Sequence, residues 1–186
     1  MSLLIFLGIL GLIGLWLVGI YNGLVSLRQR CKQAFSDIDV QLKQRHDLVP
    51  NLVETVKGYA EHEKSTLEDV IKARNVAIAA QGPAAQGAAE ATLTGAISRL
   101  IALSEAYPDL KANQNFQQLQ SELSDIENKI AASRRFFNNA VAEYNATRES
   151  VPAVFIAQRY GFEPLEFFEI DDADRKAIEQ APKVEF

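Results

Sequence analysis

The chain begins with a long stretch that carries no charged side chain, from Ser2 to Leu27. Within it, residues 3–20 are apolar or glycine without interruption. At about 1.5 Å per residue, a helix over this stretch is about 39 Å long, which exceeds the roughly 30 Å hydrocarbon core of a bilayer. Trp16 and Tyr21 lie toward its carboxyl end, and such amphipathic rings favour the headgroup layer. The sequence therefore predicts a transmembrane anchor at residues 1–27.

A cleaved signal peptide is the competing interpretation of this stretch. No Lys or Arg precedes the apolar run, the run is long, and no small-x-small cleavage site follows it. Cys31 does not fit a lipoprotein signal either, because Arg28 and Arg30 stand where small or apolar residues are required. We therefore expect an uncleaved anchor.

The charges next to the anchor predict its orientation. Arg28, Arg30 and Lys32 follow the apolar stretch, and only the amino terminus precedes it. Lys and Arg resist translocation, so we expect the amino terminus outside and the body in the cytoplasm. The single cysteine, Cys31, excludes an internal disulfide and fits a reducing compartment, although the periplasm also tolerates a chain without paired cysteines.

The net charge of −5 is unevenly distributed along the chain. Residues 28–162 carry 16 basic and 16 acidic side chains, whereas residues 163–186 carry 3 basic and 8 acidic ones. A balanced body lacks the basic stripe that binds nucleic acid, so nucleic acid is not expected as a partner. Anionic lipid would repel the acidic tail from about residue 163, which we expect to point away from the bilayer.

Apolar residues recur at heptad spacing over residues 24–80, which predicts one long helix that continues directly from the anchor. We call the line of heptad positions, spaced alternately three and four residues apart, the seam. Twelve of its sixteen positions are apolar. These positions are Leu24, Arg28, Cys31, Phe35, Ile38, Leu42, Arg45, Val49, Leu52, Val56, Tyr59, Glu63, Thr66, Val70, Ala73 and Ala77. The seam keeps its phase across Pro50, so we expect a kink there rather than a break.

Turn residues separate the remaining helices. The sequence Gln81-Gly82-Pro83 ends the first helix, and Pro108-Asp109 ends the second. Further helices are predicted over residues 84–107, 115–149, 151–160 and, more briefly, 171–180. The seam of the third helix reads Phe116, Leu119, Leu123, Ile126, Ile130, Ser133, Phe137, Ala140 and Tyr144. The predicted fold is all-α, with a transmembrane helix that continues into an antiparallel bundle of about four long helices; residues 28–186 form its soluble part.

Few residues suggest catalysis. His62-Glu63, which we place on the first helix, begins an H-E-x-x-H pattern, but Thr66 stands where the second histidine belongs. Cys31 occupies a seam position and is interpreted as a small buried apolar residue. One polar cluster, Asp37, Asp39, His46 and Asp47, supports an alternative function as a helical enzyme or metal-dependent hydrolase. We assign no catalytic, cofactor-binding or metal-binding residue.

The glycines of the anchor predict a contact between helices. On a helical wheel, Gly8, Gly11, Gly19 and Gly23 fall within about 120° of one another, and Gly19 and Gly23 form a G-x-x-x-G pair. Glycine lets two backbones approach closely in a membrane, although it is also common in membrane helices generally. We name this arc, Gly8, Gly11, Gly19 and Gly23, the glycine face, and predict that it carries a homo-oligomeric contact.

Several blocks of the sequence resemble the LemA family of bacterial membrane proteins, and the likeness extends over nearly the whole chain. The two most specific blocks are Asp37-Ile38-Asp39-Val40-Gln41-Leu42 and His46-Asp47-Leu48-Val49-Pro50-Asn51-Leu52-Val53. Further matches lie at Tyr21-Asn22-Gly23, Thr55 to Glu63, Ala73-Arg74, Tyr107 to Ala112, Asn115-Phe116, Leu119 to Leu123, Glu127-Asn128, Arg134-Arg135, Tyr144-Asn145 and Gly161-Phe162. Phe35 stands where the family often has Trp, and Cys31 where it often has an aliphatic residue.

The resemblance implies a single-pass protein of the bacterial inner membrane with a helical soluble part and no established enzyme activity. One branch of the family is found among proteins that shape magnetosome membranes. We therefore expect a non-catalytic, membrane-anchored helical scaffold or adaptor that self-associates and helps to organise or shape the membrane. Its expected partners are the lipid bilayer, further copies of itself and other membrane proteins.

Overall fold

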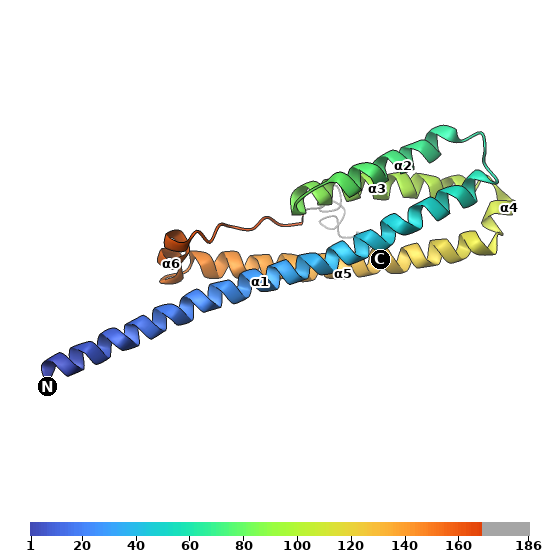
Figure 1. The fold of residues 1–186 in the computed structure, drawn as a ribbon. Helices are drawn as coiled ribbons and strands as arrows, with labels where there is room; N and C mark the ends of the chain where they lie inside the picture. Colours follow the sequence, from blue (N-terminus) through green and yellow to red (C-terminus); the bar gives the residue numbers. More distant parts are fainter. Residues whose placement is uncertain (169–186) are drawn as a thin grey trace, which may run out of the picture. The chain divides into compact units, whose positions relative to one another are not determined.

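The computed structural model of the chain describes residues 1–168, and within these residues it contains helices and no strand (Figure 1). The helices are α1 (Ser2–Lys57), α2 (Lys64–Ala79), α3 (Pro83–Ser104), α4 (Pro108–Lys111), α5 (Gln114–Glu149) and α6 (Ala153–Tyr160). The predicted all-α fold is confirmed. The short helix expected at residues 171–180 and most of the acidic tail lie outside the described residues.

The described chain divides into two compact units, and both α1 and α5 contribute to each of them. The anchor unit comprises residues 1–38 and 133–167, and the bundle unit comprises residues 39–132 together with Phe168. Each of the two long helices therefore supplies one part of its length to either unit.

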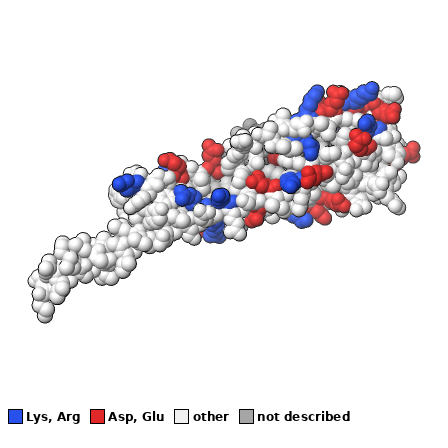
Figure 2. Space-filling model, in the orientation of Figure 1, with Lys and Arg blue, Asp and Glu red and all other residues white. Residues whose placement is uncertain are grey.

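In the anchor unit, α1 begins with a segment that packs against no described residue. Its most apolar 18-residue stretch has no buried residue and is long and apolar enough to cross a membrane. Figure 2 shows this segment without a charged side chain on the face in view. Farther along α1, Leu24, Cys31 and Ile38 are buried, and the Phe35 ring lies 5.4 Å from the Phe137 ring of α5. The seam is therefore covered only from about Leu24 onward.

The short helix α6 ends at a left-handed glycine. Gly161 has φ +68°, a conformation that suits glycine because it has no Cβ. The Phe162 N–H donates to the Ala157 carbonyl at 3.0 Å, as in a Schellman cap. Phe162 is then buried against α1, where its ring lies 5.5 Å from that of Tyr21. The predicted helix end at Gly161 is confirmed.

In the bundle unit, the last part of α1, α2, α3 and the first half of α5 run alternately up and down (Figure 1). Their inward faces share one apolar core. Its members include Val49, Leu52, Val56, Leu67, Val70, Leu93, Ile97, Leu100, Leu110, Phe116 and Leu123. Pro50 lies inside α1 and does not end it, as predicted. Asn113 caps α5 by accepting a hydrogen bond from the Phe116 N–H at 3.0 Å.

The prediction of one helix over residues 24–80 is wrong, because α1 ends at Lys57 and α2 begins at Lys64. Glycine disfavours helix by about 1 kcal/mol, and after Gly58 the Tyr59 and Ala60 N–H groups both donate to the Val56 carbonyl in a turn. The seam nevertheless resumes in phase in α2. A heptad pattern gives the buried face of each helix but does not distinguish continuation from reversal.

Two helix boundaries differ from prediction in smaller ways. Pro108 does not simply end the preceding helix but begins α4, since proline suits the first helical position. Helix α3 ends at Ser104, a few residues before the expected Tyr107. Between α2 and α3, Gly82 adopts φ +85° directly before Pro83, so the predicted turn at these residues is confirmed.

Candidate functional site: a buried ion-pair cluster

A charged side chain occupies the seam of α1 inside the bundle unit. Arg45 is only 1% exposed, although it stands in a seam whose positions are mostly apolar. A buried guanidinium is tolerated only when it is paired and hydrogen-bonded. Its partners therefore define the site.

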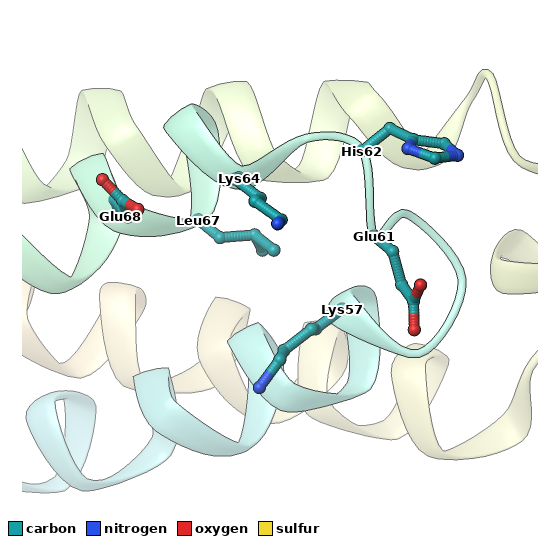
Figure 3. Close-up of a pocket in the computed structure, with 6 residues that line it drawn as sticks. All are labelled: Lys57, Glu61, His62, Lys64, Leu67 and Glu68. Atoms are coloured by element: carbon teal, nitrogen blue, oxygen red, sulfur yellow. The ribbon is translucent and has the colours of Figure 1, made fainter.

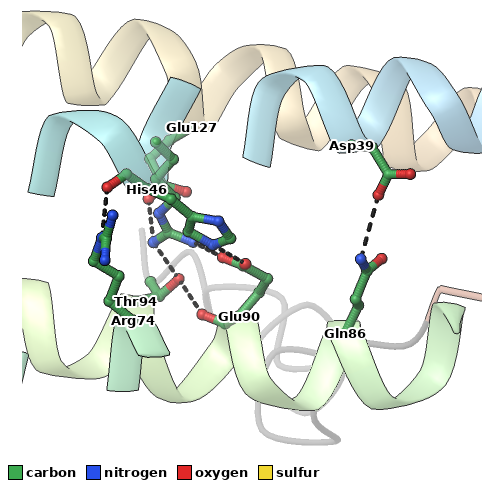
Figure 4. Close-up of polar contacts among 8 residues, drawn as sticks. Asp39, His46, Arg74, Gln86, Glu90, Thr94 and Glu127 are labelled. Atoms are coloured by element: carbon green, nitrogen blue, oxygen red, sulfur yellow. Dashed lines mark hydrogen bonds and ion pairs between the residues drawn. The ribbon is translucent and has the colours of Figure 1, made fainter. Parts of the chain in front are cut away.

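Arg45 is held by residues from two other helices, and Figure 4 labels these partners, Glu90, Thr94 and Glu127. Its Nη1 atom donates to Glu90 Oε2 of α3 at 2.8 Å. Its Nη2 atom donates to Thr94 Oγ1 at 2.7 Å and lies 2.5 Å from Glu127 Oε1 of α5. The Arg45 Nε atom is buried and has no hydrogen-bond acceptor among the described residues. One arginine thus joins α1, α3 and α5.

The neighbouring histidine shares the same carboxylate. His46 is buried, and its Nε2 atom lies 2.6 Å from Glu90 Oε1. Both oxygens of Glu90 are therefore engaged, one by Arg45 and one by His46. Arg74 of α2 donates from Nε to the His46 carbonyl at 2.7 Å. The cluster, defined as Arg45, His46, Arg74, Glu90, Thr94 and Glu127, contacts all four long elements of the bundle unit.

The polar residues of the alternative hydrolase hypothesis are not brought together. Asp37, Asp39 and Asp47 are exposed, whereas His46 is buried with Glu90. Asp39 accepts a hydrogen bond from Gln86 Nε2 at 3.3 Å, away from the histidine (Figure 4). Within residues 1–168, no group of three His, Cys, Asp or Glu side chains could hold a metal ion. The described geometry offers this hypothesis no site.

Sequence reasoning missed Glu90, Thr94 and Glu127 as partners of Arg45. One signal was available, because Glu90 is the only charged residue between Arg74 and Arg99. A lone charge in such an apolar, alanine-rich helix suggests a buried partner of opposite sign. The seam of α1 carries two charges, Arg28 and Arg45. Arg45 is the one that forms the buried pair with Glu90.

A shallow pocket of about 540 Å³ lies where α1 turns into α2 (Figure 3). Its lining side chains are Lys57, Glu61, His62, Lys64, Leu67 and Glu68. The expectation that His62 lies on a helix is wrong, because residues 58–63 form the turn that reverses the chain. The two lysines and two glutamates offset each other, so this pocket selects no ligand charge.

The glycine face lies open in the anchor unit. A Cβ atom added at Gly8, Gly11, Gly19 or Gly23 would meet nothing within 4 Å. On a helical wheel, the centre of this face lies about 150° from that of Leu24 and Cys31, which pack inward. The glycine face is thus separate from the seam that the chain uses for its own packing.

These observations define a class of protein: an all-α chain whose exposed apolar helix continues into a bundle built around buried ion pairs. The chain belongs to the LemA family, whose model matches residues 34–186. The family predicted from the sequence blocks is confirmed.

Several relatives are similar over most of the chain. The magnetosome protein MamQ of Magnetospirillum gryphiswaldense is 26% identical over 174 residues, which cover 80% of this chain and 64% of that protein. The protein MamQ 2 of Paramagnetospirillum magneticum is 24% identical over 175 residues with the same coverage. The protein LemA of Metamycoplasma hominis is 23% identical over 181 residues, covering 95% of this chain and 81% of that protein. The chain thus spans a little under two thirds of the length of the MamQ proteins.

Proposed function

We propose that this protein is a non-catalytic scaffold, anchored in the bacterial inner membrane by residues 1–27, that self-associates and organises partner proteins at the membrane. The observation that carries the proposal is the continuity of α1, which runs as one helix from Ser2 to Lys57. The same helix supplies the exposed apolar segment and, past it, the seam of the body. No linker separates the apolar segment from the seam. Two copies that associate through their anchors would therefore also bring their soluble parts together.

The glycine face supplies the contact for self-association. Its four glycines are exposed, and the inward seam lies on the other side of α1. Glycine at such positions lets two membrane helices approach closely, so that van der Waals packing between them stabilises the pair. The seam packs against other helices of the same chain, so the glycine face is the surface of α1 that we assign to a second copy.

Membrane anchoring is tested by placing a charge at the centre of the apolar segment. Leu12→Arg introduces a penalty of about 2.5–3.5 kcal/mol on insertion scales, so the variant should leave the membrane fraction for the soluble or aggregated fraction. Leu12→Ala keeps the segment apolar and should stay in the membrane. Equal retention of Leu12→Arg and wild type would contradict the anchor.

Self-association is tested by the mass of the full-length protein in mild detergent. Gly19→Leu and Gly23→Leu should lower the oligomeric mass, because each adds a bulky side chain to the glycine face. Gly14→Leu is the matched control, since Gly14 is equally open but lies outside the 120° arc of that face. If the wild type and all three variants are monomers at every concentration, self-association through the glycine face is contradicted.

A further inference from the structure

The α6 segment, residues 151–160, exposes large apolar side chains. Val151 is 77% exposed, Phe155 66% and Tyr160 63%, whereas Ala153, Ile156 and Ala157 of the same segment are buried. The buried residues fix α6 to the anchor unit, and Phe155 lies on its opposite, outward side. Soluble surfaces rarely present several large apolar residues in one short segment without a partner.

The contacts of Tyr21 place the end of α6 at the end of the apolar stretch. The Tyr21 ring lies 5.2 Å from the Tyr160 ring in an edge-to-face arrangement. Tyr21 directly follows the uninterrupted apolar run of α1. If about 20 residues cross the hydrocarbon core, Tyr21 and Tyr160 lie in the headgroup layer, where aromatic rings are favoured.

The pairing of α5 with α1 places the beginning of the segment at the same level. Phe137 faces Phe35, and Glu143 faces Arg30 through an ion pair of 2.9 Å. Six residues along α5 thus correspond to five residues back along α1. At this rate the last residue of α5, Glu149, lies level with about Val25 of α1, and Val151 follows within one turn of Tyr21.

We propose that residues 151–160 rest on the lipid bilayer, with Val151 and Phe155 inserted at the boundary between headgroups and acyl chains. The proposal deepens the membrane anchoring proposed above and rests on it. Apolar side chains at this depth gain from leaving water, as in interfacial helices. Arg159 lies over the Tyr160 ring and Arg28 over the Phe162 ring, so both guanidinium groups lie beside this aromatic cluster and can reach lipid phosphates. The bilayer is thus contacted twice, by the crossing helix and by α6.

Single tryptophans in the full-length protein test this placement. The chain has one tryptophan, Trp16, so Trp16→Phe gives a silent background for Phe155→Trp and, as a second reporter, Val151→Trp. Both positions are exposed and accept the larger ring without repacking the core. In phosphatidylcholine vesicles that contain brominated phosphatidylcholine, we expect blue-shifted emission and strong quenching from both reporters.

Phe136→Trp in the same background is the matched control. Phe136 is an exposed aromatic residue of the same unit. It lies on α5, and the part of α1 beside it is about 20 Å farther from the apolar run than Tyr21. Its emission should stay red-shifted, with several-fold weaker quenching. If the tryptophans at positions 151 and 155 are quenched no more strongly than the one at position 136, the interfacial placement is overturned. In that case quenching of Trp16 in the wild-type protein would still support the anchor. An unquenched Trp16 would overturn both.

Discussion

Arg45 shows how one residue can decide which helices pack together. A buried ion pair adds little net stability compared with apolar residues of similar volume, because desolvation offsets the attraction between the charges. Leaving one of its partners alone is strongly unfavourable. Arg45 therefore disfavours any packing of α1 that does not present Glu90 of α3 to it. We infer that the cluster sets the register of the bundle unit.

Removing Glu90 should destabilise the protein severely. Glu90→Ala leaves the buried Arg45 without its fully buried partner, and we expect a loss of about 3–5 kcal/mol in the free energy of unfolding. Urea unfolding of the full-length protein in detergent, followed by the helical circular dichroism signal, measures this loss.

The control for this variant is Glu143→Ala, which breaks the exposed pair with Arg30. Exposed pairs contribute at most about 1 kcal/mol, so this variant should unfold close to wild type. The double variant Arg45→Met with Glu90→Leu should recover part of the lost stability, because it leaves no buried charge on either residue. Equal losses for Glu90→Ala and Glu143→Ala would mean that the cluster is not a buried pair in solution.

Cys31 illustrates a second effect of burial on a single residue. Burial raises the pKa of the thiol above its ordinary value of 9.0, and the nearby Glu143 carboxylate raises it further, while Arg30 lowers it in part. The folded protein therefore holds this proton at a pH at which the unfolded chain releases it. The stability that this provides is fully present below about pH 9 and is lost as the pH rises through the folded pKa.

Alkaline unfolding tests this linkage. We expect the urea midpoint of the wild type to fall as the pH is raised above about 9, with a smaller fall in Cys31→Ala because no thiol titrates there. Tyr144, whose pKa is raised mainly by burial, extends the decline to higher pH in both proteins. Parallel declines in the two proteins would show that the thiol of Cys31 does not contribute.

At the scale of the element, helix ends decide where side chains lie more than helix interiors do. The left-handed Gly161 turns the chain after α6 and directs Phe162 onto α1. Arg148 then donates from Nε to the Phe162 carbonyl at 2.6 Å, and Tyr144 donates from its hydroxyl to the Glu163 carbonyl at 2.9 Å. These bonds hold the segment after α6 against α5.

Two glycine-to-alanine substitutions should have opposite signs. Gly161→Ala places a Cβ in the left-handed region, which costs about 1–2 kcal/mol. Gly95→Ala lies in α3, where an added Cβ meets nothing within 4 Å, and should stabilise the protein by about 0.5–1 kcal/mol. Urea midpoints of the two variants measured side by side check the pair; shifts of the same sign would contradict the cap.

For the molecule as a whole, the charges beside the anchor predict its topology. Arg28, Arg30 and Lys32 follow the apolar segment and should hold the body in the cytoplasm. Green fluorescent protein fused after Phe186 should therefore fluoresce, whereas alkaline phosphatase at the same point should be inactive. The opposite result would place the body outside the cytoplasm and make the charge bias misleading for this chain.

Local properties of the sequence determine the membrane segment, the buried face of α5 and one helix end. The uncharged stretch of α1 follows from composition, and the α5 seam from its period, because each helix buries the face on which its apolar residues recur. Likewise, the helix end at Gly161 needs only a glycine in the right place. These features depend on neighbours within about one or two turns.

Contacts between distant residues were decided only by the tertiary structure. The heptad phase continues past Gly58, so the sequence did not reveal that α1 stops at Lys57 and the chain reverses. The pairing of Arg45 with Glu90, across 45 residues, depends on that reversal. The spacing of apolar residues indicates which face of a helix is buried. Which other helix packs against that face depends on the turns and on the pairing of buried opposite charges.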